Sequence, residues 1–181
     1  MQIEPRVEDP TRSLLGHAIR GELEEMSKLW VSLDPELLAE CMSLCLRVSG
    51  YVAIDVCGWQ WPTDDDLHEV ALGIAELDLD YQLAESDAYD YLSRGALGFE
   101  ALIDIFSDHG KIATVPFLTT ASLLVAYRTD GRHWWEYLDI VEGALEEAAP
   151  LSQAAFPAVL LLSRRARVLE SRDGAERTAE A

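Results

Sequence analysis

Apolar residues recur every three or four positions along most of this chain, which is the spacing of one face of an α-helix. The first helix is predicted to begin at Asp9-Pro10, a pair typical of a helix N-terminus, and its apolar positions continue to Trp30. Two later segments, 36–57 and 115–129, are nearly uncharged. We therefore expect these two segments to be buried on most sides and to form the centre of a bundle.

The remaining helices are predicted from their caps and breakers. Thr63 can cap a helix whose first turn holds three aspartates, where the helix dipole favours acids. Residues 78–86 are expected to be a loop, and Ser86 can cap a short helix that ends near Arg94. Further helices are expected at 99–108, at 133–149 and from residue 152 onward.

These elements predict an all-α fold, because no segment shows strict apolar alternation bounded by turn residues. We expect a single-domain helical bundle of about seven or eight helices over residues 1–171, followed by a frayed C-terminal tail at 172–181. Residues 43–77 and 114–148 also share one order of elements: a buried helix, a segment with two tryptophans and an acidic amphipathic helix. The apolar positions of the acidic helices match at an offset of 71 residues: Leu67, Val70 and Ile74 against Leu138, Val141 and Leu145. Amphipathic helices can match in this way by chance, so the sequence leaves a duplication open.

Composition narrows the class of protein. The chain has 181 residues, 49% of them hydrophobic, and five tryptophans, which favours a packed core over disorder. A formal net charge of −19 argues against direct binding of nucleic acid, whose phosphates would be repelled. The N-terminus is acidic and lacks the apolar segment of a signal peptide. Together with an odd number of cysteines, three, this favours a cytoplasmic protein with reduced thiols. The longest uncharged apolar run, 114–127, is shorter than the ~20 residues that span a bilayer.

The charge is concentrated in one part of the chain. No lysine or arginine lies between Arg47 and Arg94, whereas eleven acids do. Towards the end of this stretch the acids alternate with tyrosines, which are frequent anchors of protein interfaces, and acids steer basic partners. The residues expected to bind a partner are Asp78, Asp80, Tyr81, Glu85, Asp87, Tyr89, Asp90 and Tyr91. The alternative is a solvated connector whose tyrosines pack onto the core.

A second acidic pattern could hold a metal. Asp65, Asp66 and Glu69 place carboxylates one turn apart on a helix, and Mg²⁺ prefers such oxygen ligands. The spacing resembles the aspartate-rich motif of isoprenoid and terpene synthases, which are also all-helical. The resemblance covers five residues, and the second metal motif of that family is not visible in this chain. The simpler interpretation is a first turn stabilised by the helix dipole.

Two functions are therefore expected, in order. The first is a non-enzymatic cytoplasmic protein that binds another protein, or itself, through an acidic, tyrosine-rich face, with no cofactor and no contact with nucleic acid or membrane. The alternative is a magnesium-dependent all-helical hydrolase or lyase that uses the carboxylates at 65–69. No catalytic residue is predicted for the first function.

Overall fold

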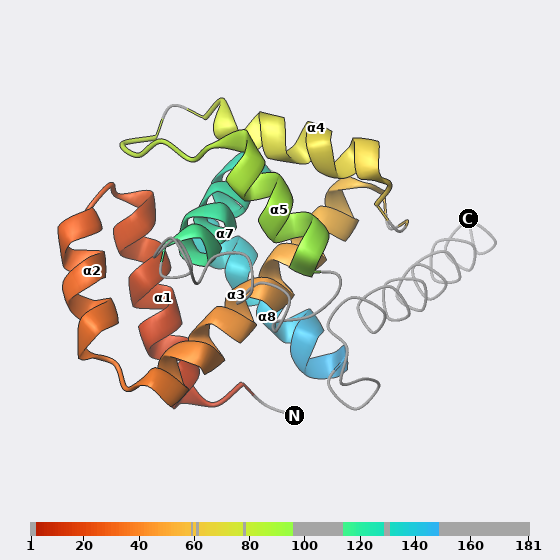
Figure 1. Cartoon of the computed structure of the whole chain (residues 1–181). Helices are drawn as coiled ribbons and strands as arrows, with labels where there is room; N and C mark the ends of the chain where they lie inside the picture. The colour runs from red at the N-terminus through yellow and green to blue at the C-terminus, as the bar shows by residue number, and fades with distance from the viewer. Residues whose placement is uncertain are drawn as a thin grey trace, which may run out of the picture.

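The helical spacing of the sequence is reflected in the structure, and the protein is an all-α helical bundle. A computed structural model describes residues 3–58, 60, 62–77, 79–95, 114–128 and 131–148, and these residues contain no strand. Their helices are α1 (Pro5–Ile19), α2 (Leu23–Ser32), α3 (Pro35–Val56), α4 (Asp64–Ala75), α5 (Glu85–Gly95), α7 (Val115–Ala126) and α8 (Trp134–Ala148) (Figure 1). The helices predicted at 99–108 and from 152, and the predicted tail at 172–181, lie outside the described residues.

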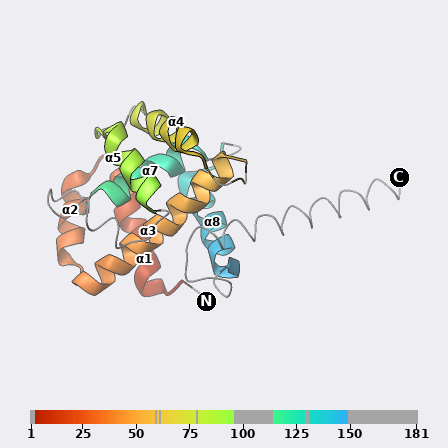
Figure 2. The same cartoon turned by 45° about the vertical axis from the view of Figure 1, so that its right-hand side comes forward.

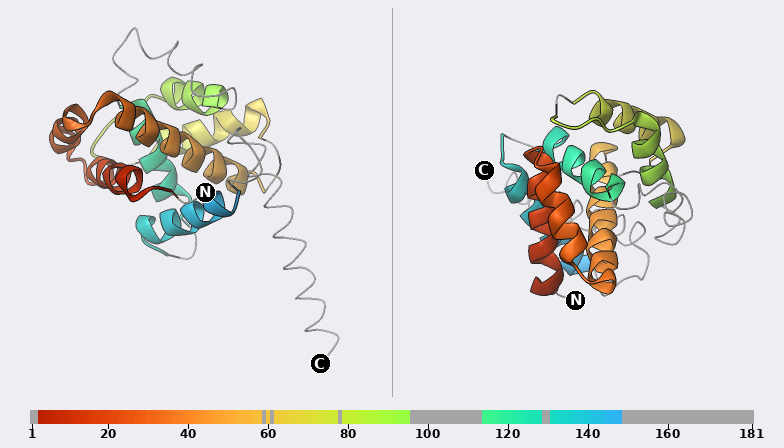
Figure 3. Two further views of the ribbon diagram at one scale, coloured as in Figure 1. Left: turned by 90° about the horizontal axis from the view of Figure 1, so that it is seen from below. Right: turned by 60° about the vertical axis from the view of Figure 1, so that its left-hand side comes forward.

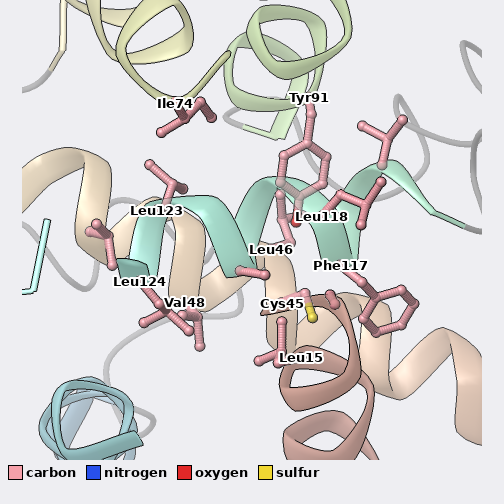
Figure 4. Packing of buried hydrophobic residues seen from close by; sticks show 14 of the residues in the cluster. Leu15, Cys45, Leu46, Val48, Ile74, Tyr91, Phe117, Leu118, Leu123 and Leu124 are labelled. Atoms are coloured by element: carbon pink, nitrogen blue, oxygen red, sulfur yellow. The ribbon is translucent and has the colours of Figure 1, made fainter. Parts of the chain in front are cut away.

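Helix α7 is the centre of the bundle. It carries no charged residue, every position from Val115 to Leu124 is buried, and α1, α3, α4, α5 and α8 all pack against it (Figures 1 and 2). Figure 4 shows Leu123 and Leu124 of α7 in one cluster with Leu15 of α1, Val48 of α3, Ile74 of α4 and Tyr91 of α5. The predicted central pair of helices is thus confirmed, and a leucine near the middle of each is buried: Leu44 in α3 with 3% exposure and Leu123 in α7 with 0%.

One central helix also resembles a membrane span in length and composition. Helix α3 is long and apolar enough to cross a bilayer, but 61% of its most apolar stretch is buried inside the bundle. A core helix passes the same test, so this observation is weak evidence for a span.

The helix predicted from Asp9 to Trp30 is in fact two helices. Gly21, with φ of 68°, ends α1. Its N–H donates to the carbonyl of Ala18 (3.0 Å), and the N–H of Glu22 donates to that of His17 (2.9 Å), which together form a Schellman motif. A Cβ on Gly21 would lie 2.4 Å from the Cβ of Asp80. The prediction was wrong because the apolar spacing continues across a glycine that reverses the chain.

Two predicted helix starts are also displaced. Helix α1 begins at Pro5, so Pro10 lies inside it and the carbonyl of Arg6 lacks the usual N–H four residues on. Either proline can occupy a first turn, and the sequence pattern does not choose between them. Helix α5 begins at Glu85, so Ser86 is a helical residue and not the cap.

The predicted cap at Thr63 is confirmed. The Thr63 side chain accepts a hydrogen bond from the backbone N–H of Asp66 (3.2 Å), and the Asp66 carboxylate accepts one from that of Thr63 (2.7 Å). These two reciprocal bonds form a capping box, which fixes the direction in which α4 leaves the preceding loop.

The similarity at an offset of 71 has a structural counterpart. Helix α3 packs on both α7 and α8, and α4 packs on α7, so each central helix contacts the other helix pair. The hydroxyls of Ser49 and Thr120, which are 71 residues apart, lie 2.7 Å from each other at the buried crossing of α3 and α7. A contact between matching positions is what two copies of one helix pair related by an approximate twofold axis would produce, and it supports a duplication.

Helices α5 and α8 lie on opposite sides of α3 (Figure 3, left). The N-terminal segment runs beside α8, where the backbone N–H of Ile3 donates to Oε1 of Glu146 (2.8 Å). The acidic helices α4 and α5 lie together at the top of Figure 1, and α1 and α2 lie together at its left.

Candidate functional site

Helices α4 and α5 pack against each other and carry a group of carboxylates (Figure 1). We call this surface the acidic face. Its carboxylates are exposed or half-buried and belong to Asp64, Asp65, Glu69, Glu76, Asp80, Glu85 and Asp90. Asp87, in the first turn of α5, is half-buried beside them and has a contact of its own.

The seven carboxylates of the acidic face lie outside the arginine and lysine ion pairs of the described residues. Within the described residues, the ion pairs of arginine and lysine join Arg6 to Glu4 and Glu40, Arg12 to Glu8, Asp139 and Glu142, Arg20 to Glu22, and Lys28 to Glu24 and Glu25. None of these pairs includes a residue of the acidic face. On the acidic face itself, Nδ1 of His68 lies 4.0 Å from Oε1 of Glu85, a contact that is an ion pair when the imidazole is protonated.

An aromatic stack joins the two helices of the acidic face. The rings of His68 on α4 and Tyr89 on α5 are stacked, with centroids 3.8 Å apart and an angle of 4° between their planes. The Tyr89 hydroxyl also donates a hydrogen bond to Oδ1 of Asp64. These contacts hold an aromatic surface at a fixed position between carboxylates.

Among the described residues of α4 and α5, one large apolar side chain is well exposed to solvent. Leu72 is 44% exposed on α4, one helical turn from His68 on one side and from Glu76 on the other. The outward side of α4 thus places an apolar group between carboxylates, as the core and rim of a protein interface are arranged.

Tyr81, predicted to bind a partner, is a core residue. It is 8% exposed, and its hydroxyl donates to the carbonyl of Leu118 (3.2 Å) and lies 2.9 Å from Oγ of Ser122. Burial raises the pKa of this hydroxyl.

Tyr81 also lines a pocket of about 380 Å³, formed by Leu23, Met26, Ser27, Trp30, Tyr81, Gln82, Thr114 and Leu118. This pocket has no charged lining residue and does not belong to the acidic face.

Tyr91, also predicted to bind a partner, is fully buried (Figure 4). Burial strongly raises the pKa of its hydroxyl, which has no aligned hydrogen-bond partner in the described part of the chain. The pattern of α5 contained the signal for this burial, because Ala88, Tyr91 and Leu92 stand three and four residues apart and all are buried. We therefore remove Tyr81 and Tyr91 from the candidate interface.

The other predicted partner-binding residues divide by position. Glu85, Tyr89 and Asp90 lie on the acidic face with Asp87 beside them, and Asp80, at the edge of that face, also packs against the turn at Gly21. Asp78 is outside the described residues. The sequence prediction missed His68, Asp64 and Leu72, since the contact between α4 and α5 that brings them to Tyr89 is a tertiary one.

The proposed metal ligands are arranged as a helix start. Asp66 belongs to the capping box, and its hydrogen bonds from Thr63 lower the pKa of its carboxyl. Asp65 and Glu69 are exposed to solvent. Across the described residues, no group of three or more histidine, cysteine, aspartate or glutamate side chains is arranged to hold a metal ion. The arrangement therefore gives the magnesium alternative no support beyond its spacing.

Comparison with known proteins adds no family to this picture. No family model matches the chain, and no curated protein or solved structure is significantly similar to it. Any inference about function therefore depends on the geometry of the described residues.

Proposed function

We propose that this protein is a non-enzymatic cytoplasmic protein that binds a basic protein partner through its acidic face. The observation that carries the proposal is the segregation of charge. Arg6, Arg12, Arg20 and Lys28 pair with acids of α1, α2, α3 and α8, whereas the arginine and lysine ion pairs of the described residues omit the acidic face. A surface whose carboxylates lie apart from these arginine and lysine ion pairs attracts basic proteins and raises their association rate.

Rigidity also supports a binding surface. The capping box fixes the start of α4, and the stack of His68 on Tyr89 ties α5 to it. A surface that is ordered before binding loses less conformational entropy when the partner arrives. Leu72 and the His68–Tyr89 stack would form the apolar and aromatic centre of the contact, and the carboxylates its polar rim.

The test compares two variants with the same change in charge. The face variant carries Asp65→Asn, Glu69→Gln and Glu76→Gln, all at exposed positions of α4 or its C-terminus. The control variant carries Glu24→Gln, Glu25→Gln and Glu36→Gln, which are exposed on α2 and α3. Each protein is immobilised, and partners are captured from a lysate of the native host and identified by mass spectrometry.

The proposal predicts at least one basic protein that the wild type and the control capture and the face variant does not. Capture of the same proteins by all three would contradict it. Equal loss from both variants would mean that net charge, and not the acidic face, governs binding.

A further inference from the structure

A carboxylate is buried where α8 faces α1. Glu142 of α8 is 5% exposed, and its Oε2 accepts a hydrogen bond from Nη2 of Arg12 on α1. Its other oxygen, Oε1, is buried and has no hydrogen-bond partner among the described residues. A buried carboxylate that is satisfied on one oxygen only is costly in its charged form.

The surroundings of Glu142 add negative charge. Nη2 of Arg12 also donates to Oδ1 of Asp139 (2.6 Å), and Nε of Arg12 lies 3.0 Å from Oε1 of Glu8 without being aligned for a hydrogen bond. Three carboxylates therefore share one guanidinium. When like charges share a site, proton uptake by one of them relieves the repulsion.

The other helices packed against α8 do not supply a second cation. Cys45 is the titratable group of α3 that interacts with Glu142, and α7 has no charged residue between Val115 and Ala126. On α8 itself, Glu146 lies one turn beyond Glu142 and accepts from the backbone N–H of Ile3. Arg12 is thus the one basic side chain that meets Glu142 in the described part of the chain.

These contacts lie along the line where α1 and α8 meet, which we call the α1–α8 seam. Ile3 meets Glu146, Arg12 meets Asp139 and Glu142, and a Cβ on Gly16 would lie 3.5 Å from the ring of Trp134. The order of these contacts shows that the two helices run antiparallel. Side chains bridge most of the seam, so its strength depends on their charge state.

We infer that Glu142, buried with one oxygen unpaired and sharing one guanidinium with two other carboxylates, takes up a proton in the folded protein, and that its ionisation weakens the docking of α8 onto α1. The proton comes from solvent and adds to one carboxylate oxygen, and no other bond changes. The seam is then a pH-sensitive element of the fold, separate from the acidic face.

The direction of the effect follows from the environment of Glu142. Burial raises the pKa of Glu142, Arg12 lowers it, and the charges of Glu8 and Asp139 raise it; together they place the folded value at about 7. Between the unfolded value of 4.5 and this folded value, the folded state holds more protons than the unfolded state. The contribution of Glu142 to stability is therefore largest at low pH, falls as pH rises towards 7, and is constant above that range.

Amide hydrogen exchange followed by mass spectrometry measures the opening of α8 directly. After correction for the intrinsic rate, a folded pKa near 7 predicts that α8 opens about tenfold less often at pH 6 than at pH 8. Helix α4, whose position matching Glu142 is the buried Ala71, serves as an internal reference and should not share this change. An equal change in α8 and α4 of the wild-type protein would overturn the inference.

Two variants sharpen the test. Glu142→Gln keeps the size of the side chain and removes its proton equilibrium, so the pH dependence of α8 opening should disappear. Asp139→Asn removes an exposed carboxylate from the same guanidinium and should leave most of that dependence in place. If Glu142→Gln keeps the wild-type slope, or if Asp139→Asn alone abolishes it, Glu142 is not the responsible group.

Discussion

Helices α4 and α8 follow the central helices α3 and α7 in the chain, and they bury apolar residues at matching positions 71 residues apart. The two helices differ in whether their acidic residues pair with basic side chains. At the position of the buried Ala71 in α4, α8 has Glu142, which reaches Arg12 of α1. The outward acids of α4 meet no basic side chain among the described ion pairs, whereas Asp139 of α8 is paired. The apolar pattern determines how a helix packs, and the charges around that pattern determine whether its surface is used within the fold or left for a partner.

The largest expected effect concerns the buried core formed by the central helices α3 and α7. Leu123 and Leu44 lie in the central helices α7 and α3, so either leucine-to-alanine substitution should lower the free energy of unfolding by about 2–5 kcal/mol. Leu72→Ala, at an exposed position of α4, should change it by less than about 0.5 kcal/mol. Denaturant unfolding of the three variants measures this difference. A midpoint unchanged by Leu123→Ala would mean that the centre of the bundle is elsewhere.

The next effect tests the paired charges. Arg12→Met leaves Glu142 buried without its cation and should cost about 2–4 kcal/mol at pH 8, less than for a fully buried pair because the Arg12 side chain is 28% exposed. The cost should shrink at pH 6, where Glu142 with its raised pKa takes up a proton. Arg6→Met removes an ion pair that is mostly in solvent and provides the control. Equal costs for both substitutions would contradict the special role of Arg12.

A smaller effect concerns the contact between the turn after α1 and Asp80, at the edge of the acidic face. Gly21 and Gly131 both have positive φ, 68° and 69°, but only Gly21 faces a close neighbour, the side chain of Asp80. Either glycine-to-alanine substitution should cost about 1 kcal/mol for the backbone, and Gly21→Ala should cost more because its Cβ collides with Asp80. Thermal unfolding of the two variants compares them. Equal midpoints would show that the turn and Asp80 do not touch.

The smallest expected effect concerns metal at the acidic face. Because Asp66 is held by Thr63 and the helix dipole already offsets the first-turn acids, millimolar magnesium should shift the melting temperature by less than about 1 °C. Following unfolding during a magnesium titration measures this. A rise of several degrees that Asp65→Asn abolishes would favour the magnesium-dependent enzyme over the binding protein.

Much of the fold could be predicted from local chemistry. The two weakly charged segments form α3 and α7, and the Thr63 cap was identified because its partner Asp66 is three residues away. The break at Gly21 was missed because the Schellman motif requires a backbone conformation that apolar spacing does not report. The turn is also held against Asp80, a contact between residues 59 positions apart.

The candidate site was predictable only in part. The acids at 64–66 and 69 were predicted on a helix that begins after Thr63, and they lie on α4, but two of the three tyrosines are buried. Tyr91 belongs to the apolar side of α5, and Tyr81 contacts α7. Glu142 was overlooked, although a glutamate four residues after Leu138 and three before Leu145 interrupts an apolar pattern. Whether such a residue is buried depends on a cation from another helix, in this case Arg12.

The most direct test of the acidic face as a binding surface is the salt dependence of association with a captured basic partner. Charge-steered binding is screened over about 8 Å at physiological ionic strength, so the association rate of the wild type should fall steeply with added salt. The variant Asp65→Asn, Glu69→Gln, Glu76→Gln should show a lower rate and a shallower salt dependence, while the α2–α3 control variant retains the wild-type slope. A salt-insensitive rate, or the same slope for both variants, would contradict the account.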